Sequence, residues 1–152
     1  MPLEGERKPW LVVPRTANSF VAEGRLSPDG HWLAYTSQES GNREVYVVAF
    51  RGGQGKWQIS TNGGYQPQWS GDGKELYYFN QASRSVLVVP VKGLNGGLQF
   101  GVAQPLASNS TSNQVGFYDV TPDGKKILLN LVAQQVSQSV SVVTNFTAGL
   151  KK

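Results

Sequence analysis

Short apolar segments separated by polar turns run along the whole chain, and the same order of segments appears three times. Each copy starts with a turn, at residues 27–30, 70–73 and 121–124, and continues into a segment that is apolar at consecutive positions. A strand that is apolar on both faces is buried on both faces. The pattern therefore predicts an all-β chain whose sheets are stacked on one another.

The three turns share a local chemistry that explains why the chain reverses there. Proline presets φ at the first central position, aspartate accepts hydrogen bonds from the following backbone, and glycine adopts positive φ. The second copy has Gly71 where the others have proline, which predicts the same turn with a looser backbone. Asp29, Asp72 and Asp123 are spread one per copy, so we expect them to cap turns and not to gather round a metal ion.

A second apolar segment follows each turn, at residues 45–48, 86–89 and 140–143, and its β-branched residues favour strand over helix. The polar stretches 39–43, 81–84 and 134–137 before these segments are expected to be hairpin loops. Outer strands follow at 56–61 and 98–106, but the third copy has none. Residues 9–13 resemble an outer strand without a sheet, which gives twelve strands in the order one, four, four and three.

The turns are spaced 43 and 51 residues apart, near the roughly 40–50 residues of one four-stranded propeller blade. We therefore expect residues 1–152 to form one unit with blades at about 20–61, 64–106 and 114–147. Closed propellers typically have about four to eight blades. Three blades are thus expected to be half of a six-bladed ring, completed either by a second copy or by the remaining blades of a longer chain.

A homodimer would give the unpaired N-terminal segment a place. In a ring of two copies, the blade before the first blade is the partner's third blade, which lacks an outer strand. We therefore expect residues 8–14 to complete that blade by strand exchange, through Trp10, Leu11, Val12 and Val13.

The copies that begin at Ser27, Ser70 and Thr121 resemble the WD40-like PD40 repeats of TolB-type β-propellers. Residues 40–47, 73–78 and 145–151 are similar to the C-terminal propeller region of large bacterial proteins, where the propeller follows a kinase domain or a DNA-binding regulator. The resemblance implies a sensory or interaction module with an extracytoplasmic location. The Trp-Asp dipeptide of eukaryotic WD40 repeats is absent, so their recognition rules do not carry over.

Composition narrows the function further. Charged residues make up 16% of the chain, the net charge is +4, and no basic stripe alternates with aromatic residues, so nucleic acid is not an expected partner. Cysteine is absent, and no apolar run of about 18 residues occurs, so we expect no thiolate metal site and no membrane insertion. His31 is the only histidine and directly follows a turn glycine, where we expect it to be exposed. We expect no catalytic activity, metal or cofactor.

The expected binding site is the mouth of the central channel, where propellers commonly bind a ligand or a peptide. Aromatic residues near the starts of the inner strands and polar residues of neighbouring loops are the candidates: Phe20, Arg43, Asn62, Tyr65, Gln66, Arg84 and Tyr118. The function expected from these features is a non-catalytic binding or sensory module. The alternatives are the propeller of a serine peptidase that gates a hydrolase encoded elsewhere, and a TolB-like structural scaffold.

Overall fold

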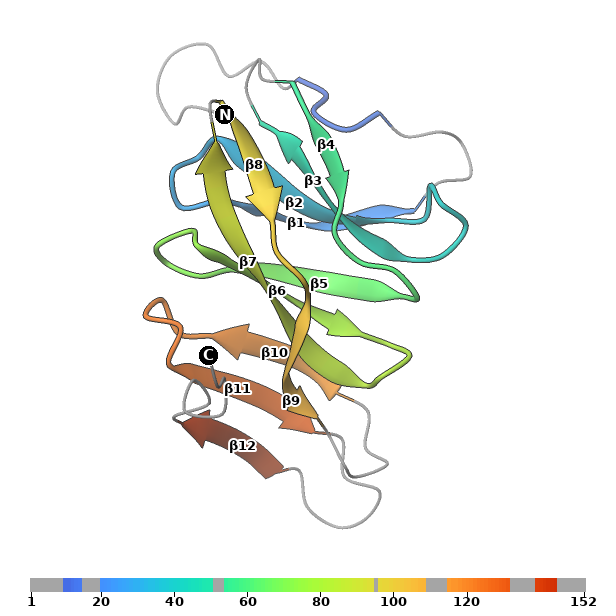
Figure 1. The fold of residues 1–152 in the computed structure, drawn as a ribbon. Helices are drawn as coiled ribbons and strands as arrows, with labels where there is room; N and C mark the ends of the chain where they lie inside the picture. The colour runs from blue at the N-terminus through green and yellow to red at the C-terminus, as the bar shows by residue number, and fades with distance from the viewer. Residues whose placement is uncertain are drawn as a thin grey trace.

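The computed structural model describes residues 10–14, 20–50, 54–94, 96–108, 115–131 and 139–144 of the 152-residue chain. The described residues contain no helix and form three antiparallel sheets stacked in chain order (Figure 1). The all-β prediction is confirmed. Blade 1 consists of β1 (Val21–Leu26), β2 (Trp32–Ser37), β3 (Glu44–Ala49) and β4 (Lys56–Gln58), hydrogen-bonded in that order.

Blades 2 and 3 follow the same path from an inner strand outward. Blade 2 consists of β5 (Gly64–Trp69), β6 (Glu75–Asn80), β7 (Ser85–Leu94), β8 (Gly97–Phe100) and β9 (Gln104–Ser108). Blade 3 consists of β10 (Val115–Val120), β11 (Lys126–Leu131) and β12 (Ser139–Thr144). The inner strand β5 lies between β1 and β10, so each blade contacts the next along the stack (Figure 1).

The distribution of strands differs from the sequence prediction. The predicted outer strand at 98–106 is split, because β7 is ten residues long and pairs with β8 through Val91–Leu94 and with β9 through Ser85–Val88. Residues 10–14 form no strand within the chain, and the Trp10 ring packs 5.7 Å from that of Phe50. The predicted loop at 134–137 lies outside the described residues.

Two apolar clusters join the blades, one on each face of blade 2. Ala34 and Val47 of blade 1 pack with Leu76 of blade 2, whereas the next residue, Tyr77, packs with Ile127 of blade 3. Successive residues of a strand point to opposite faces, so the double-faced apolar strands serve two interfaces at once.

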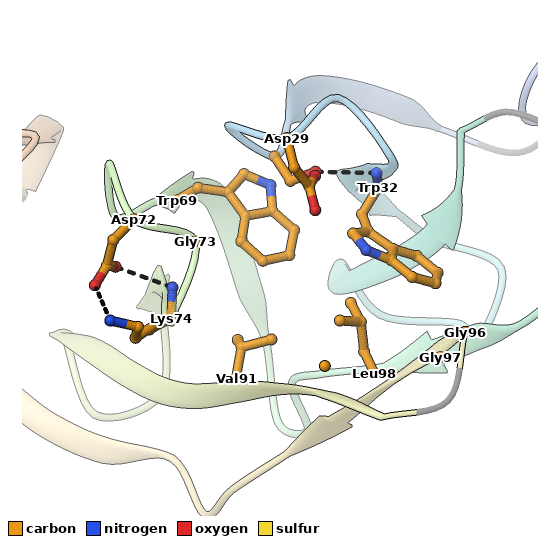
Figure 2. A pocket seen from close by; sticks show the side chains of 12 residues that line it. Asp29, Trp32, Trp69, Asp72, Gly73, Lys74, Val91, Gly96, Gly97 and Leu98 are labelled. Atoms are coloured by element: carbon orange, nitrogen blue, oxygen red, sulfur yellow. Dashed lines mark hydrogen bonds and ion pairs between the residues drawn. The ribbon is translucent and has the colours of Figure 1, made fainter.

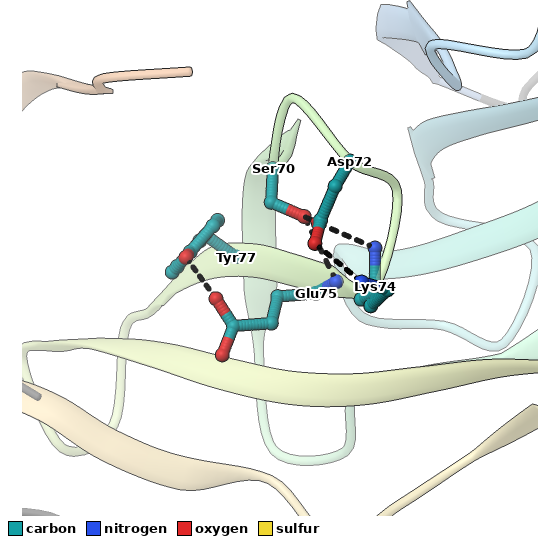
Figure 3. Close-up of polar contacts among 5 residues, drawn as sticks. All are labelled: Ser70, Asp72, Lys74, Glu75 and Tyr77. Atoms are coloured by element: carbon teal, nitrogen blue, oxygen red, sulfur yellow. Dashed lines mark hydrogen bonds and ion pairs between the residues drawn. The ribbon is translucent and has the colours of Figure 1, made fainter. Parts of the chain in front are cut away.

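The turn chemistry is as the sequence predicts. In the turn at 70–73, Asp72 Oδ1 accepts a hydrogen bond from the Lys74 amide at 3.0 Å (Figure 3). In the turn at 121–124, Asp123 Oδ1 accepts one from the Lys125 amide at 3.1 Å. The turn at 27–30 has the same bond at 3.0 Å. The hydrogen bond from the Lys74 amide, followed by that from the Ser70 hydroxyl, lowers the pKa of Asp72 to about 2. The three aspartates therefore cap turns, and His31 is exposed beside the first of them.

Gly71 also makes a contact that the sequence does not predict. The Gly71 amide donates a hydrogen bond to the Pro122 carbonyl at 2.9 Å, which links the turns of blades 2 and 3. A Cβ atom on Gly71 would lie 2.4 Å from that carbonyl oxygen. Proline has no N–H to donate, so glycine at this position tightens the contact between two blades.

Candidate functional site

A cavity of about 550 Å³ lies between blades 1 and 2, at the end of the sheets where three connections meet. These are the β2–β3 turn, the β4–β5 connection and the β6–β7 turn. We call this cavity the loop pocket. Its described lining is almost entirely amide and backbone, with one guanidinium: Gln38, Gly41, Asn42, Arg43, Asn62, Gly63, Gln81 and Ala82.

Gly63 fixes the floor of the loop pocket by joining the two blades. Its amide donates to Glu44 Oε1 of blade 1 at 2.9 Å, and its carbonyl accepts from Asn80 Nδ2 of blade 2 at 2.6 Å. Asn62 and Gly63 both have positive φ, at 66° and 92°. This left-handed pair turns the chain from the outer strand of one blade into the inner strand of the next.

The carboxylate of Glu44 anchors this connection from below. Glu44 is 3% exposed, and its second oxygen accepts a hydrogen bond from the Ser60 hydroxyl. Ser60 Oγ in turn accepts the Val45 amide at 2.8 Å. Because a buried carboxylate is stabilised by hydrogen-bond donors, this network ties the β4–β5 connection, which lines the loop pocket, to β3.

Arg43 provides the positive charge of the loop pocket. Its Cζ atom lies 4.4 Å from the centroid of the Phe20 ring, within the range of a cation–π contact. The described residues give Arg43 no carboxylate partner. The Phe20 backbone is also tied to the loop pocket, because its carbonyl accepts a hydrogen bond from the amide of the lining residue Gln38 at 3.1 Å. The guanidinium is thus oriented by an aromatic face, and no carboxylate of the described residues pairs with it.

A second polar network crosses the inner strands. Glu23 and Gln66 sit at bulges in β1 and β5, with positive φ of 59° and 56°. Glu23 Oε2 accepts the Gln66 amide at 2.8 Å and the Thr36 hydroxyl at 2.7 Å. Burial, and then the Glu23 carboxylate, raises the pKa of Tyr65, while Arg43 opposes that rise. The network therefore lies next to the loop pocket.

The residues predicted for the channel mouth do not all lie at one site. Arg43 and Asn62 line the loop pocket, and Phe20 supports it. Tyr65 and Gln66 are partly buried at the blade interface, and Arg84 is exposed on the neighbouring turn but is not part of the described lining.

Tyr118 is not an exposed mouth residue. It is 6% exposed, packs in the cluster between blades 2 and 3, and uses its hydroxyl to bind the Gln66 carbonyl. Burial raises its pKa well above the usual range. Sequence reasoning missed Glu23 and Glu44 because both carboxylates are placed by contacts with distant strands.

A smaller cavity of about 380 Å³ lies at the opposite end, between the turns of blades 1 and 2. Figure 2 shows Trp32 and Trp69 on its sides, with Val91 and Leu98 below them. Its carboxylates, Asp29 and Asp72, already hold their own turns, as described above. This cavity therefore has the features of a packing groove between blades.

Two further properties are limited to the described part of the chain. No group of three His, Cys, Asp or Glu side chains there could hold a metal ion. No helix in that part is long and apolar enough to cross a membrane.

Neither a protein-family model nor a curated protein matches the sequence. Solved structures do match the fold. TolB from Acinetobacter baumannii has a TM-score of 0.59 at 20% identity over 82% of this chain. Oligogalacturonate lyase from Vibrio parahaemolyticus has a TM-score of 0.56 at 17% identity over 70% of this chain. A prolyl endopeptidase has a TM-score of 0.53 at 12% identity over 86% of this chain.

These likenesses establish the architecture of the chain. The chain covers 30%, 27% and 23% of the lengths of the TolB, lyase and endopeptidase structures. At such identities the similarity concerns the fold, which is a TolB-like β-propeller fold.

Proposed function

We propose that the chain is a non-catalytic binding module with PD40-type repeats, and that it uses its TolB-like propeller fold to present the loop pocket to a polar ligand that carries a carboxylate. The ring is completed either by a second copy or by further blades. The observation that supports this proposal most directly is the placement of Arg43, whose guanidinium is oriented by Phe20 beside a wall of amides.

The lining determines the class of ligand. A guanidinium binds carboxylates with paired, charge-assisted hydrogen bonds. The amides of Gln38, Asn62 and Gln81 supply donors and acceptors for hydroxyl or peptide groups. The described lining contains no hydroxyl or carboxylate side chain that could act as nucleophile or base, which supports a binding role over a catalytic one.

The experiment uses isothermal titration with two pairs of probes. The acidic probes are a short galacturonic acid oligomer and a peptide with a free C-terminal carboxylate, and their neutral counterparts are a galactose oligomer and the amidated peptide. We expect at least one acidic probe to bind and its neutral counterpart to bind about tenfold more weakly, the effect of losing about 1.4 kcal/mol of interaction.

The variants locate the site. R43A should weaken binding by a similar factor, because it removes the guanidinium, whereas R84A changes an exposed arginine outside the described lining. Equal losses in the two variants, or binding that does not depend on the carboxylate, would contradict the proposal.

A serine-peptidase gate is the second candidate, favoured by the likeness to a prolyl endopeptidase. A gate would contact a hydrolase domain. Mixing the chain with such a domain encoded beside it, and finding that peptidase specificity changes, would favour this function over the first.

A further inference from the structure

The open face of blade 3 exposes positions that are buried in the other two blades. The strand register pairs Ala34 with Val47 in blade 1, and pairs Tyr77 with Val88 in blade 2. Ala34 and Tyr77 are 0% exposed, because the next blade covers them. Leu128 has the same register position in blade 3, and it is 42% exposed.

The inner strands show the same difference. Tyr65 pairs with Phe79 in blade 2 and packs against the cluster shared with blade 3. Phe117 has the corresponding position on β10, opposite Asn130, and is 69% exposed. Phe117 and Leu128 therefore form an apolar face of the kind that a following blade covers.

Blade 1 has the complementary open face. Trp69 of blade 2 and Val120 of blade 3 pack against the blade that precedes them. The same register position in blade 1 is occupied by Leu26, which is 48% exposed because no other blade of the described residues packs against it.

Charge distinguishes a second copy from an arbitrary apolar partner. Arg25, Gln68 and Asp119 occupy one register position, opposite Ala34, Tyr77 and Leu128 respectively. Between blades 1 and 2 this position makes a direct contact, since Arg25 Nε donates to Gln68 Oε1 at 3.3 Å. If a second copy places its blade 1 next to blade 3 as blade 2 lies next to blade 1, the exposed Asp119 lies beside the second copy's Arg25. Opposite charges then meet.

We propose that a second copy of this chain docks its blade 1 onto blade 3, and that two such contacts close a ring of six blades. Leu128 and Phe117 then pack against the second copy's Leu26, and Asp119 pairs with the second copy's Arg25. Ring closure by two identical contacts follows the usual symmetry of homodimers. None of these residues belongs to the described lining of the loop pocket.

Strand exchange belongs to the same contact. Blade 3 has three strands among the described residues, and β12 is its outer one. Residues 10–14 lie at the blade 1 end of the stack, at the opposite end from β12 (Figure 1). In the proposed ring they add a fourth strand to blade 3 of the second copy, and Trp10 and Leu11 are 44% and 76% exposed in the single chain.

The experiment is sedimentation of the full chain over a range of micromolar concentrations. The wild-type chain should form a species of twice 16.5 kDa. L128E should shift it towards monomer by at least tenfold in Kd, because the substitution buries a charge at the contact. V102E is the matched control, since Val102 is 81% exposed but follows β8, away from both open faces.

Charge reversal tests the register. D119R and R25D should each weaken the dimer, because each puts like charges together, and the double variant R25D/D119R should restore it. K92D and Q99R are the matched controls on exposed strand positions of blade 2. Deleting residues 1–13 should also abolish the dimer. Circular dichroism of each variant separates loss of dimer from loss of fold.

Several results would overturn the inference. One is a monomeric wild-type chain, which is the result expected if further blades of a longer chain close the ring. Another is an assembly larger than a dimer. The third is an equal dimer Kd for L128E and V102E. Failure of the double variant to recover what the single reversals lose would overturn the proposed pairing of Asp119 with Arg25.

Discussion

The Tyr118 hydroxyl donates a hydrogen bond to the Gln66 carbonyl at 2.6 Å, and this bond joins the inner strand of blade 3 to the bulge of blade 2. The amide of the same residue, Gln66, is held by Glu23 of blade 1 at 2.8 Å. One peptide bulge is therefore secured by the blades on both sides, and the three inner strands act as one unit.

Y118F removes the donor and leaves a buried carbonyl without it. We expect a loss of about 1–3 kcal/mol in the free energy of unfolding, measured by urea denaturation. Y46F is the matched control, because the Tyr46 hydroxyl is buried and has no hydrogen-bond partner in the described part of the chain. It should leave the free energy unchanged or raise it, and equal losses in both variants would refute the assigned role of the bond.

G71A should destabilise the contact between blades 2 and 3. A Cβ atom there would lie 2.4 Å from the Pro122 carbonyl oxygen, so the two turns must separate. We expect a loss of about 1–3 kcal/mol in the free energy of unfolding, and a larger loss for G71P, which also removes the N–H donor. G93A, where a Cβ atom meets nothing within 4 Å, is the control and should be close to neutral.

E44Q should weaken both the fold and the loop pocket. Glu44 Oε1 accepts a hydrogen bond from the Gly63 amide, and Oε2 accepts one from the Ser60 hydroxyl. The amide nitrogen of glutamine would replace one of these acceptors with a second donor. The expected loss in unfolding free energy is about 1–3 kcal/mol. E39Q alters only an exposed pair with Lys56 and should cost less than about 1 kcal/mol. Thermal melts of the two variants give the comparison.

Acid should destabilise the chain through its turns. The folded-state pKa of Asp72 is lowered from 3.8 to about 2 by the Lys74 amide and the Ser70 hydroxyl. A lowered folded pKa contributes stability above the unfolded pKa, and that stability is lost as pH falls through the folded value. The free energy of unfolding should therefore fall between about pH 4 and pH 2.

D72N provides the test, because asparagine retains an acceptor for the turn but does not titrate. The variant should show a shallower fall over this pH range than the wild-type chain. The difference should be modest, since Asp72 is exposed and solvent screens its interactions. Identical pH profiles would show that the Asp72 carboxylate contributes nothing to this acid sensitivity.

The sequence predicts those parts of the fold that depend on neighbours along the chain. The turns at 27–30, 70–73 and 121–124 form from local hydrogen bonds, and the apolar segments after them form strands. The positive φ of Glu23 and Gln66 could not be predicted, because contacts with other blades hold these non-glycine residues there.

The loop pocket was predicted only in part for the same reason. Arg43 and Asn62 belong to loops whose polar character is visible in the sequence. The burial of Glu44 depends on Ser60 and Gly63 in a different connection. Tyr118 has the aromatic character expected of a ligand site, but its burial follows from the packing of blade 3 on blade 2.

The bond between Gly71 and Pro122 makes the three repeats non-interchangeable. A rearranged gene with the first two repeats exchanged would place Pro28 opposite the Pro122 carbonyl, where it has no hydrogen to donate. Each repeat is therefore suited to its own position in the chain. In a library of chains with shuffled repeats, folded chains should have the native order far more often than any other order, even though the turns share nearly the same residues.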